Sequence, residues 1–124
     1  MKINQGDIII INAEPHSGME MGGHNRQHIR RPMLVLSNNY YNHNPYMSLL
    51  IGMPITSVDH HDPTKYFKLT PNLLINNNVH GYVVMWQMQN FDYNTRHGKV
   101  VDHLRGIESI KSLSQAGKDM IDVI

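Results

Sequence analysis

The 124-residue chain carries a formal net charge of +1, and 40% of its residues are hydrophobic. This composition indicates a single domain over residues 1–124 with one core, and it excludes a disordered chain and a uniformly basic nucleic-acid binder. The sequence contains no cysteine, which excludes disulfides, thiol catalysis and thiolate metal ligands. No apolar run approaches the ~20 residues of a membrane span, and the N-terminus lacks the apolar segment of a signal peptide. We therefore expect a cytoplasmic protein with no membrane partner.

Three short strands are expected in the first half of the chain. The β-branched run Ile8–Ile11 follows the turn residues Gly6-Asp7 and reads as a buried strand. After a long loop, Met33–Leu36 is the second strand, and an Asn-rich connection leads to a third over Ser48–Ile55. Gly52 and Pro54 suggest a bulge or a sheet edge near the end of that third strand.

The second half continues with strands and ends with a helix. Alternation predicts a short strand at Tyr66–Leu69 and a fifth over Tyr82–Met88, while Lys99–Ile110 is ambiguous and could hold the end of a last strand. In residues 112–124 the apolar positions follow helical spacing, and Ser112 with Gln115 matches a capping box. Together these elements predict a mainly β (α+β) fold, a small barrel-like sheet closed by a C-terminal helix.

The loop before the second strand is locally cationic. Arg26, Arg30 and Arg31 fall in a stretch without acidic residues, although a solvated charge run would look the same. Arg31 differs from the others because it directly precedes Pro32, which restrains its backbone, and because it sits at the rim of the core. An arginine held there is suited to binding a phosphate.

Hydroxyl groups are expected at a matching position. Thr56 and Ser57 end the third strand. If the second and third strands are antiparallel neighbours, the end of one lies beside the start of the other, so Thr56 would approach Arg31. An arginine and a hydroxyl at a sheet rim suit a phosphodiester, because the cation offsets the charge that grows on the phosphorane.

The nine histidines invite a metal site, which we do not predict. His24 and His28 are spaced by four, but the glycines and arginines around them argue against a helix that would bring both to one face. The adjacent His60 and His61 are poorly placed to chelate one ion. We expect no metal and no cofactor.

Five motifs in order resemble those of the MazF/PemK family of toxin ribonucleases. They cover roughly residues 6 to 98 and read GDIIIINAEP, GMEMGG, RRPMLVLSNN, MPITS and GYVVMWQMQNFD.

This resemblance implies a fold, an activity and partners. The fold is a small SH3-like β-barrel of the CcdB/PemK type with a C-terminal helix. The activity is metal-independent, sequence-specific cleavage of single-stranded RNA, chiefly mRNA, in which the 2′-OH attacks the adjacent phosphate to give a 2′,3′-cyclic phosphate and a 5′-OH. The partners are a second copy of the chain and a cognate MazE/PemI-like antitoxin, whose acidic extended segment would fill the RNA groove.

Matching of the motifs assigns roles to particular residues. Arg31 corresponds to the family's catalytic arginine and Thr56 to its catalytic threonine, while Glu20 falls on the acidic residue of the glycine-containing loop. The general base stays open among His16, His28 and Glu20.

The chain also departs from the family pattern. The segment HNRQHI is extra, and Met19 and Val84 stand where some members have a histidine and an arginine, so an acid–base scheme built on the fifth strand does not transfer. Trp86, where those members carry an aspartate, could stack on a base or lie in the core. The residues expected to contact RNA are His24, Arg26, His28, Arg30, Ser57, Trp86 and Gln87.

Two other functions fit the same fold. The first is a non-nuclease toxin that poisons DNA gyrase, as CcdB does, which would have no use for Arg31 and Thr56. The second is an RNA-binding module that does not cleave.

Overall fold

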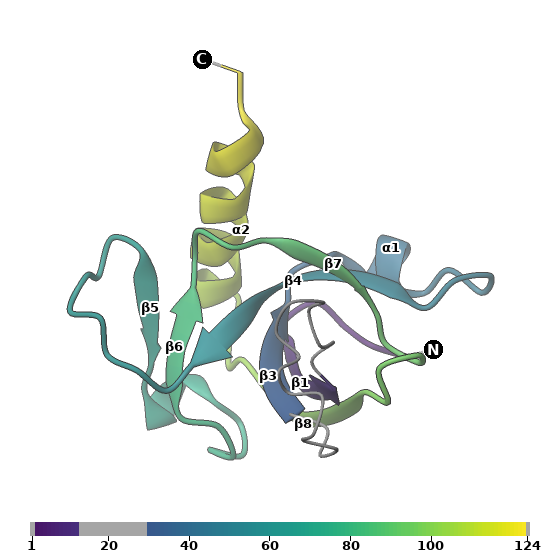
Figure 1. Cartoon of the computed structure of the whole chain (residues 1–124), viewed down its shortest axis with the longest axis horizontal. Helices are drawn as coiled ribbons and strands as arrows, with labels where there is room; N and C mark the ends of the chain where they lie inside the picture. Colours follow the sequence, from purple (N-terminus) through teal and green to yellow (C-terminus); the bar gives the residue numbers. More distant parts are fainter. Residues whose placement is uncertain (1, 13–29, 124) are drawn as a thin grey trace, which may run out of the picture.

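A curled antiparallel sheet and one long helix dominate the computed structural model, which describes residues 2–12 and 30–123 (Figure 1). The strands of the sheet are β1 (Asp7–Asn12), β3 (Arg30–Val35), β4 (Leu49–Thr56), β5 (Tyr66–Leu69), β6 (Gly81–Val84), β7 (Gln89–Asp92) and β8 (Lys99–His103). The helices are α1 (Asn39–Asn42), the 3-10 turn η1 (Pro71–Leu73) and α2 (Glu108–Ile121). No helix in the described part of the chain is long and apolar enough to cross a bilayer.

Strand β4 is the centre of the sheet. The strand order is β5-β6-β4-β3-β1-β8, and β7 also pairs with β4. Leu49 to Gly52 pair with β7, whereas Ile55 and Thr56 pair with β6. Pro54 falls between these two sets, so its missing N–H interrupts neither ladder. The bulge or edge expected near Gly52 and Pro54 is therefore wrong, because both residues lie in register opposite β3 in a central strand.

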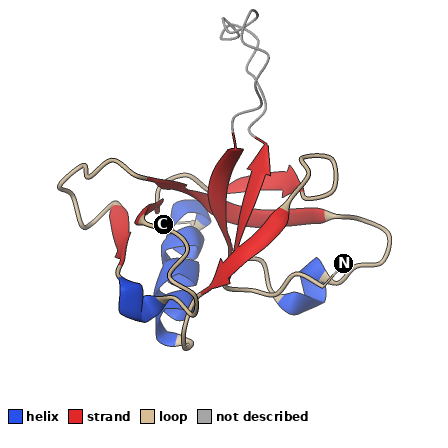
Figure 2. Ribbon diagram, turned by 90° about the horizontal axis from the view of Figure 1, so that it is seen from below, coloured by secondary structure: helices blue, strands red, loops and turns tan. Residues whose placement is uncertain are grey.

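Side chains alternate between the two faces of the sheet and form two cores. One core includes Ile8, Leu34, Met53 and Val83, and Leu113 of α2 is buried in it. The other core contains Ile3, Ile9, Ile11, Met33, Val35, Leu50 and Phe91. Figure 2 shows α2 lying against the sheet as a separate layer. Because β3 and β4 contribute to both cores, their backbones are fixed from both sides.

The helix begins earlier than its spacing predicted. It starts at Glu108 with Ile107 as an uncapped N-terminal residue, so Ser112 and Gln115 lie inside the helix and the predicted capping box is wrong. Glu108 in the first turn instead favours this end through the helix dipole. Gly117 lies where the helix packs closely, since a Cβ there would lie 3.0 Å from the Met88 sulfur.

The fifth strand expected over Tyr82–Met88 forms only in its first part, and its predicted end at Met88 is wrong. Strand β6 ends at Val84, the chain turns at Met85 and Trp86, and a separate strand β7 follows. The turn lacks the glycine, proline or asparagine that usually marks one, so the apolar run concealed it.

The remaining strands agree with the sequence analysis to within a few residues. The predicted strand at Tyr66–Leu69 is confirmed, and Ile8–Ile11 and Ser48–Ile55 lie within or largely within β1 and β4. The second strand starts at Arg30 and ends at Val35, so the two arginines belong to it. The last strand continues to His103 rather than ending at Val101.

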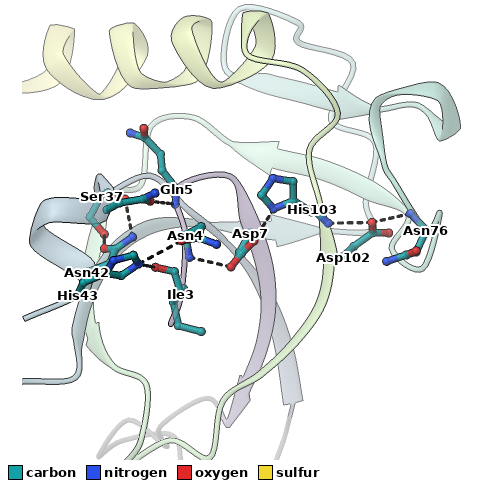
Figure 3. A network of polar contacts seen from close by, with 11 residues as sticks. Ile3, Asn4, Gln5, Asp7, Ser37, Asn42, His43, Asn76, Asp102 and His103 are labelled. Carbon is teal, nitrogen blue, oxygen red and sulfur yellow. Dashed lines mark hydrogen bonds and ion pairs between the residues drawn. The ribbon is translucent and has the colours of Figure 1, made fainter. Parts of the chain in front are cut away.

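Buried polar groups join the ends of β1, β8 and the loop before β6 (Figure 3). Asp102 is 1% exposed and accepts hydrogen bonds from the backbone N–H groups of Asn76, Asn78 and His103. Burial alone would raise the pKa of Asp102, but these donors outweigh it and hold the pKa below the ordinary value. The His103 ring also contacts the Asp7 carboxylate. This network fixes β8 against β1.

Candidate active site

Arg31 and Thr56 lie at the same end of neighbouring strands. Strands β3 and β4 are antiparallel, and Arg31 and Thr56 each lie two residues beyond their last pair, Met33 and Pro54. The paired ladder stops at Met33–Pro54, and the two strands diverge beyond it (Figure 1). Arg31 and Thr56 therefore lie at the diverging ends of β3 and β4.

The alternation of the strands places both residues on one face. Arg31 shares its face with Met33 and Val35, and Thr56 shares its face with Pro54, which pairs with Met33. The buried members of this face belong to the second core. Arg31 is thus the exposed end of a row whose other members, Met33 and Val35, are buried. This agrees with the position at the rim of the core that its place next to Pro32 suggested.

The neighbouring Arg30 is engaged within the fold. Its guanidinium donates to the Asn12 side chain and the His97 carbonyl, both at 2.8 Å, and to the Ile10 carbonyl at 3.4 Å. By contrast, the Arg31 side chain forms no hydrogen bond or ion pair with any other described residue. Arg31 is accordingly the better placed of the two cations for an external anion, while Arg30 joins β3 to β1 and the loop before β8.

The Thr56 hydroxyl has a defined orientation. Its Oγ1 accepts a hydrogen bond from the Val58 N–H at 3.2 Å. This occupies one lone pair and leaves the hydroxyl proton available for donation. Ser57 follows it as an exposed residue at the start of the loop.

Three further polar side chains near Thr56 were not singled out from the sequence. Tyr82 lies opposite Thr56 and Lys68 lies opposite Tyr82, so the row continues onto β6 and β5. Asp59 lies next to both. The His61 N–H, and to a smaller extent the Tyr82 hydroxyl, His61 and Lys68, lower the pKa of Asp59. Only the strand register reveals this row, because its members are far apart in sequence.

The predicted RNA contacts Trp86 and Gln87 are not on a strand. Trp86 lies in the turn after β6 with 49% of its surface exposed, so the alternative of a core tryptophan is wrong. Gln87 follows it in the connection to β7, half-buried.

The remaining predicted site residues lie outside the described residues. These are Glu20, His24, Arg26 and His28, together with the candidate base His16. Within residues 2–12 and 30–123, no group of three histidine or acidic side chains could hold a metal ion.

The Arg31 guanidinium and the Thr56 hydroxyl are groups of the kind that bind phosphate in proteins. A guanidinium presents several donors to phosphate oxygens, and a hydroxyl donor on the same face can add one more. Such preorganised donors favour the charge that develops in a pentacoordinate phosphorus transition state.

Comparison with known protein families places the chain in one of them. Residues 4–115 match the model of the PemK-like, MazF-like toxins of type II toxin–antitoxin systems. The match spans most of the chain, so the protein belongs to this toxin family. No curated protein is significantly similar to it in sequence.

Solved structures share the fold at low sequence identity. MazF (Form-I) from Deinococcus radiodurans superposes with a TM-score of 0.74 at 21% identity, covering 98% of this chain and 97% of that one. The MazE–MazF complex (Form-III) from the same organism gives 0.68 at 21% identity, covering 97% and 94%. An endoribonuclease in complex with its cognate antitoxin from a mycobacterial species gives 0.64 at 13% identity, covering 96% and 94%. The expected barrel-like β fold with a C-terminal helix is thereby confirmed.

Proposed function

We propose that this toxin is a metal-independent endoribonuclease that cleaves single-stranded mRNA at specific short sequences. The observation that carries the proposal is the placement of Arg31 and Thr56 on one face at the diverging ends of β3 and β4. The solved neighbour described as an endoribonuclease shares this fold. Because the proposed substrate is mRNA, we propose that the toxin acts in the cytoplasm.

The reaction is an internal transesterification. The ribose 2′-OH loses its proton to a base and attacks phosphorus, the P–O5′ bond breaks, and the leaving oxygen takes up a proton. The products are a 2′,3′-cyclic phosphate and a 5′-OH. Arg31 offsets the charge on the nonbridging oxygens, and the Thr56 hydroxyl donates to the same group. Glu20 is the third catalytic residue that we propose, and the base is one of His16, His28 and Glu20.

A cleavage assay tests this proposal. Purified protein is incubated with a long single-stranded RNA in EDTA, and the fragment ends are characterised. We expect fragments with 5′-OH and cyclic phosphate ends for the wild type and a strongly reduced yield of them for Arg31→Ala. Intact RNA, or cleavage that is independent of Arg31, would contradict the proposal. Sequencing of the ends also gives the cleavage motif.

The partners that we propose are a second copy of the chain and a MazE/PemI-like antitoxin. Two of the structural neighbours are complexes with an antitoxin, which supports such a partner here. An acidic antitoxin segment would bind over Arg31 and compete with RNA. Light scattering of the toxin tests dimerisation, and inhibition of cleavage by the neighbouring gene product tests the antitoxin.

Poisoning of DNA gyrase is the alternative that this site does not favour. A protein that acts only by docking has no need for an exposed arginine and an oriented hydroxyl on one face. Trapped gyrase–DNA breaks with intact mRNA in expressing cells would reverse this preference.

A further inference from the structure

An open recess lies beside the row that contains Thr56. It has a volume of about 490 Å³ and is lined by His60, Asp62, Lys65, Tyr66 and Trp86. The loop between β4 and β5 supplies the first three, the start of β5 supplies Tyr66, and the turn after β6 supplies Trp86. Three aromatic rings and one cation are thus gathered outside the Arg31–Thr56 pair.

The rings are already arranged as part of a stack. His60 lies on Tyr66 with ring centroids 4.3 Å apart and an angle of 16° between the planes. Trp86 also lines the recess, and 49% of its surface is exposed to solvent. Flat aromatic surfaces of this kind are the platforms on which unpaired bases stack.

Hydrogen bonds hold the walls of the recess in place. The Asp59 side chain accepts from the His61 N–H at 2.8 Å, and the Asp62 side chain accepts from the Thr64 N–H at 3.1 Å. The Met85 N–H donates to the Lys65 carbonyl at 2.9 Å, which ties the tryptophan turn to the loop. The backbone around the recess is thus partly fixed before a flat ligand enters, which lowers the entropy cost of binding.

The recess lies within reach of an RNA strand held at Thr56. Thr56 pairs with Tyr82, and Tyr66 pairs with Val84 on the same strand and the same face. Tyr66 therefore lies two strands away from Thr56 and two residues further along, which corresponds to a distance of roughly 12 Å between the two residues. This is about the length of three stacked nucleotides at ~3.4 Å each.

The acidic residue in the recess narrows the choice of ligand. A hydrogen bond from the Thr64 hydroxyl, and to a smaller extent one from the Thr64 N–H, lowers the pKa of Asp62. This carboxylate is therefore ionised at neutral pH. It would repel a phosphate but accept hydrogen bonds from an amino group on the edge of a base. Lys65 supplies the cation for the neighbouring phosphate.

We propose that the recess lined by His60, Tyr66 and Trp86 binds one unpaired base of the RNA, and that Asp62 favours adenine, cytosine or guanine over uracil there. The inference rests on the proposed function, since it takes single-stranded RNA as the substrate. It assigns to His60, Asp62, Lys65 and Tyr66 a role in reading sequence, apart from the residues that cut.

The single tryptophan makes the test direct. Short oligomers of 2′-O-methyl adenosine, cytidine or uridine lack a free 2′-OH and are bound without cleavage. We expect adenosine and cytidine oligomers to quench Trp86 fluorescence, and uridine oligomers to bind several-fold more weakly. Oligomers that bind by anisotropy but leave Trp86 fluorescence unchanged would overturn the proposal.

Variants of adjacent histidines provide a matched comparison. His60→Ala should weaken oligomer binding by about tenfold, as expected for loss of one stacking partner. His61→Asn removes a neighbouring ring that does not line the recess, and asparagine tolerates its positive φ of 56°. Equal binding by both variants would contradict the assignment.

The remaining outcomes separate the two proposals. Asp62→Asn retains an oxygen for Thr64 and should reduce the preference over uridine, whereas an unchanged preference would remove Asp62 from base recognition. Quenching by an acidic peptide but not by oligomers would assign the recess to a protein and overturn the proposal. Failure of RNA cleavage in EDTA, with quenching intact, contradicts the nuclease and leaves the recess as a base-binding site.

Discussion

Gly81 lies directly against Thr56: a Cβ on Gly81 would come within 2.4 Å of the Thr56 carbonyl oxygen. Gly81 also has a φ of +140°, a conformation that residues with a side chain rarely adopt. The position of the proposed catalytic residue Thr56 therefore depends on the glycine that begins β6, the strand paired with the end of β4.

Gly81→Ala should impair both stability and cleavage. The close contact forces the backbone of β4 or β6 to move, at a cost of about 1–3 kcal/mol in the free energy of unfolding. Displacement of Thr56 should also lower the cleavage rate of the folded fraction. Urea unfolding and single-turnover cleavage measure the two effects. Gly106→Ala is the control, because Gly106 also has a positive φ of +79° but no atom lies within 4 Å of the position that a Cβ would take there. The Gly106→Ala variant should be less stable than the wild type but should cleave RNA at the wild-type rate.

The adjacent arginines should behave in opposite ways. Arg30→Ala removes hydrogen bonds to Asn12, His97 and Ile10, so it should lower stability by about 1–2 kcal/mol. Arg31→Ala should leave the unfolding midpoint nearly unchanged and reduce cleavage by about 10²- to 10³-fold. Comparable losses of stability in the two variants would show that Arg31 is also a structural residue.

Substitutions at Thr56 should separate its hydroxyl from its shape. Thr56→Val keeps the branched shape but removes the donor, and should reduce the cleavage rate by about 10²-fold. Thr56→Ser keeps the Oγ that accepts from Val58 and should retain most of the activity. A rate for Thr56→Val close to that of the wild type would exclude the hydroxyl from the reaction.

Stability at low pH should report on Asp102. Its folded-state pKa is lowered, so its contribution is fully present above the unfolded pKa of about 3.9 and is lost as the pH falls through the lower folded-state value. Asp102→Asn should cost about 2 kcal/mol at neutral pH. The difference from the wild type should shrink below about pH 4. Urea unfolding across this pH range measures the change, and a constant difference would contradict the assignment.

Local patterns were sufficient to predict most strands. Tyr66–Leu69 was placed correctly, and Ile8–Ile11 lies within β1, because alternation and turn residues there coincide with the pairing. The turn at Trp86 was missed because its position is set by β4, whose two halves need different partners. No residue in the turn itself indicates that requirement.

The candidate site was only partly predictable for a similar reason. Arg31 and Thr56 could be proposed because one lies at the start and the other at the end of a recognisable strand, and because each matches a family motif. Tyr82, Lys68 and Asp59 gain significance only from the register of β4, β6 and β5. Pairings between distant segments are not encoded in any short window of sequence.

The change of partner along β4 has a consequence for how such toxins can diverge. Strands β5 and β6 form a wing whose ladder with the body of the sheet runs along the last residues of β4, while Leu69 and Val83 of the wing pack inward in the first core. Exposed positions of the loop between β4 and β5, such as His60 and Lys65, can therefore change without disturbing the packing that holds Arg31. A change in what the protein recognises need not alter how it reacts, so new targets are accessible to this scaffold by drift in one peripheral segment.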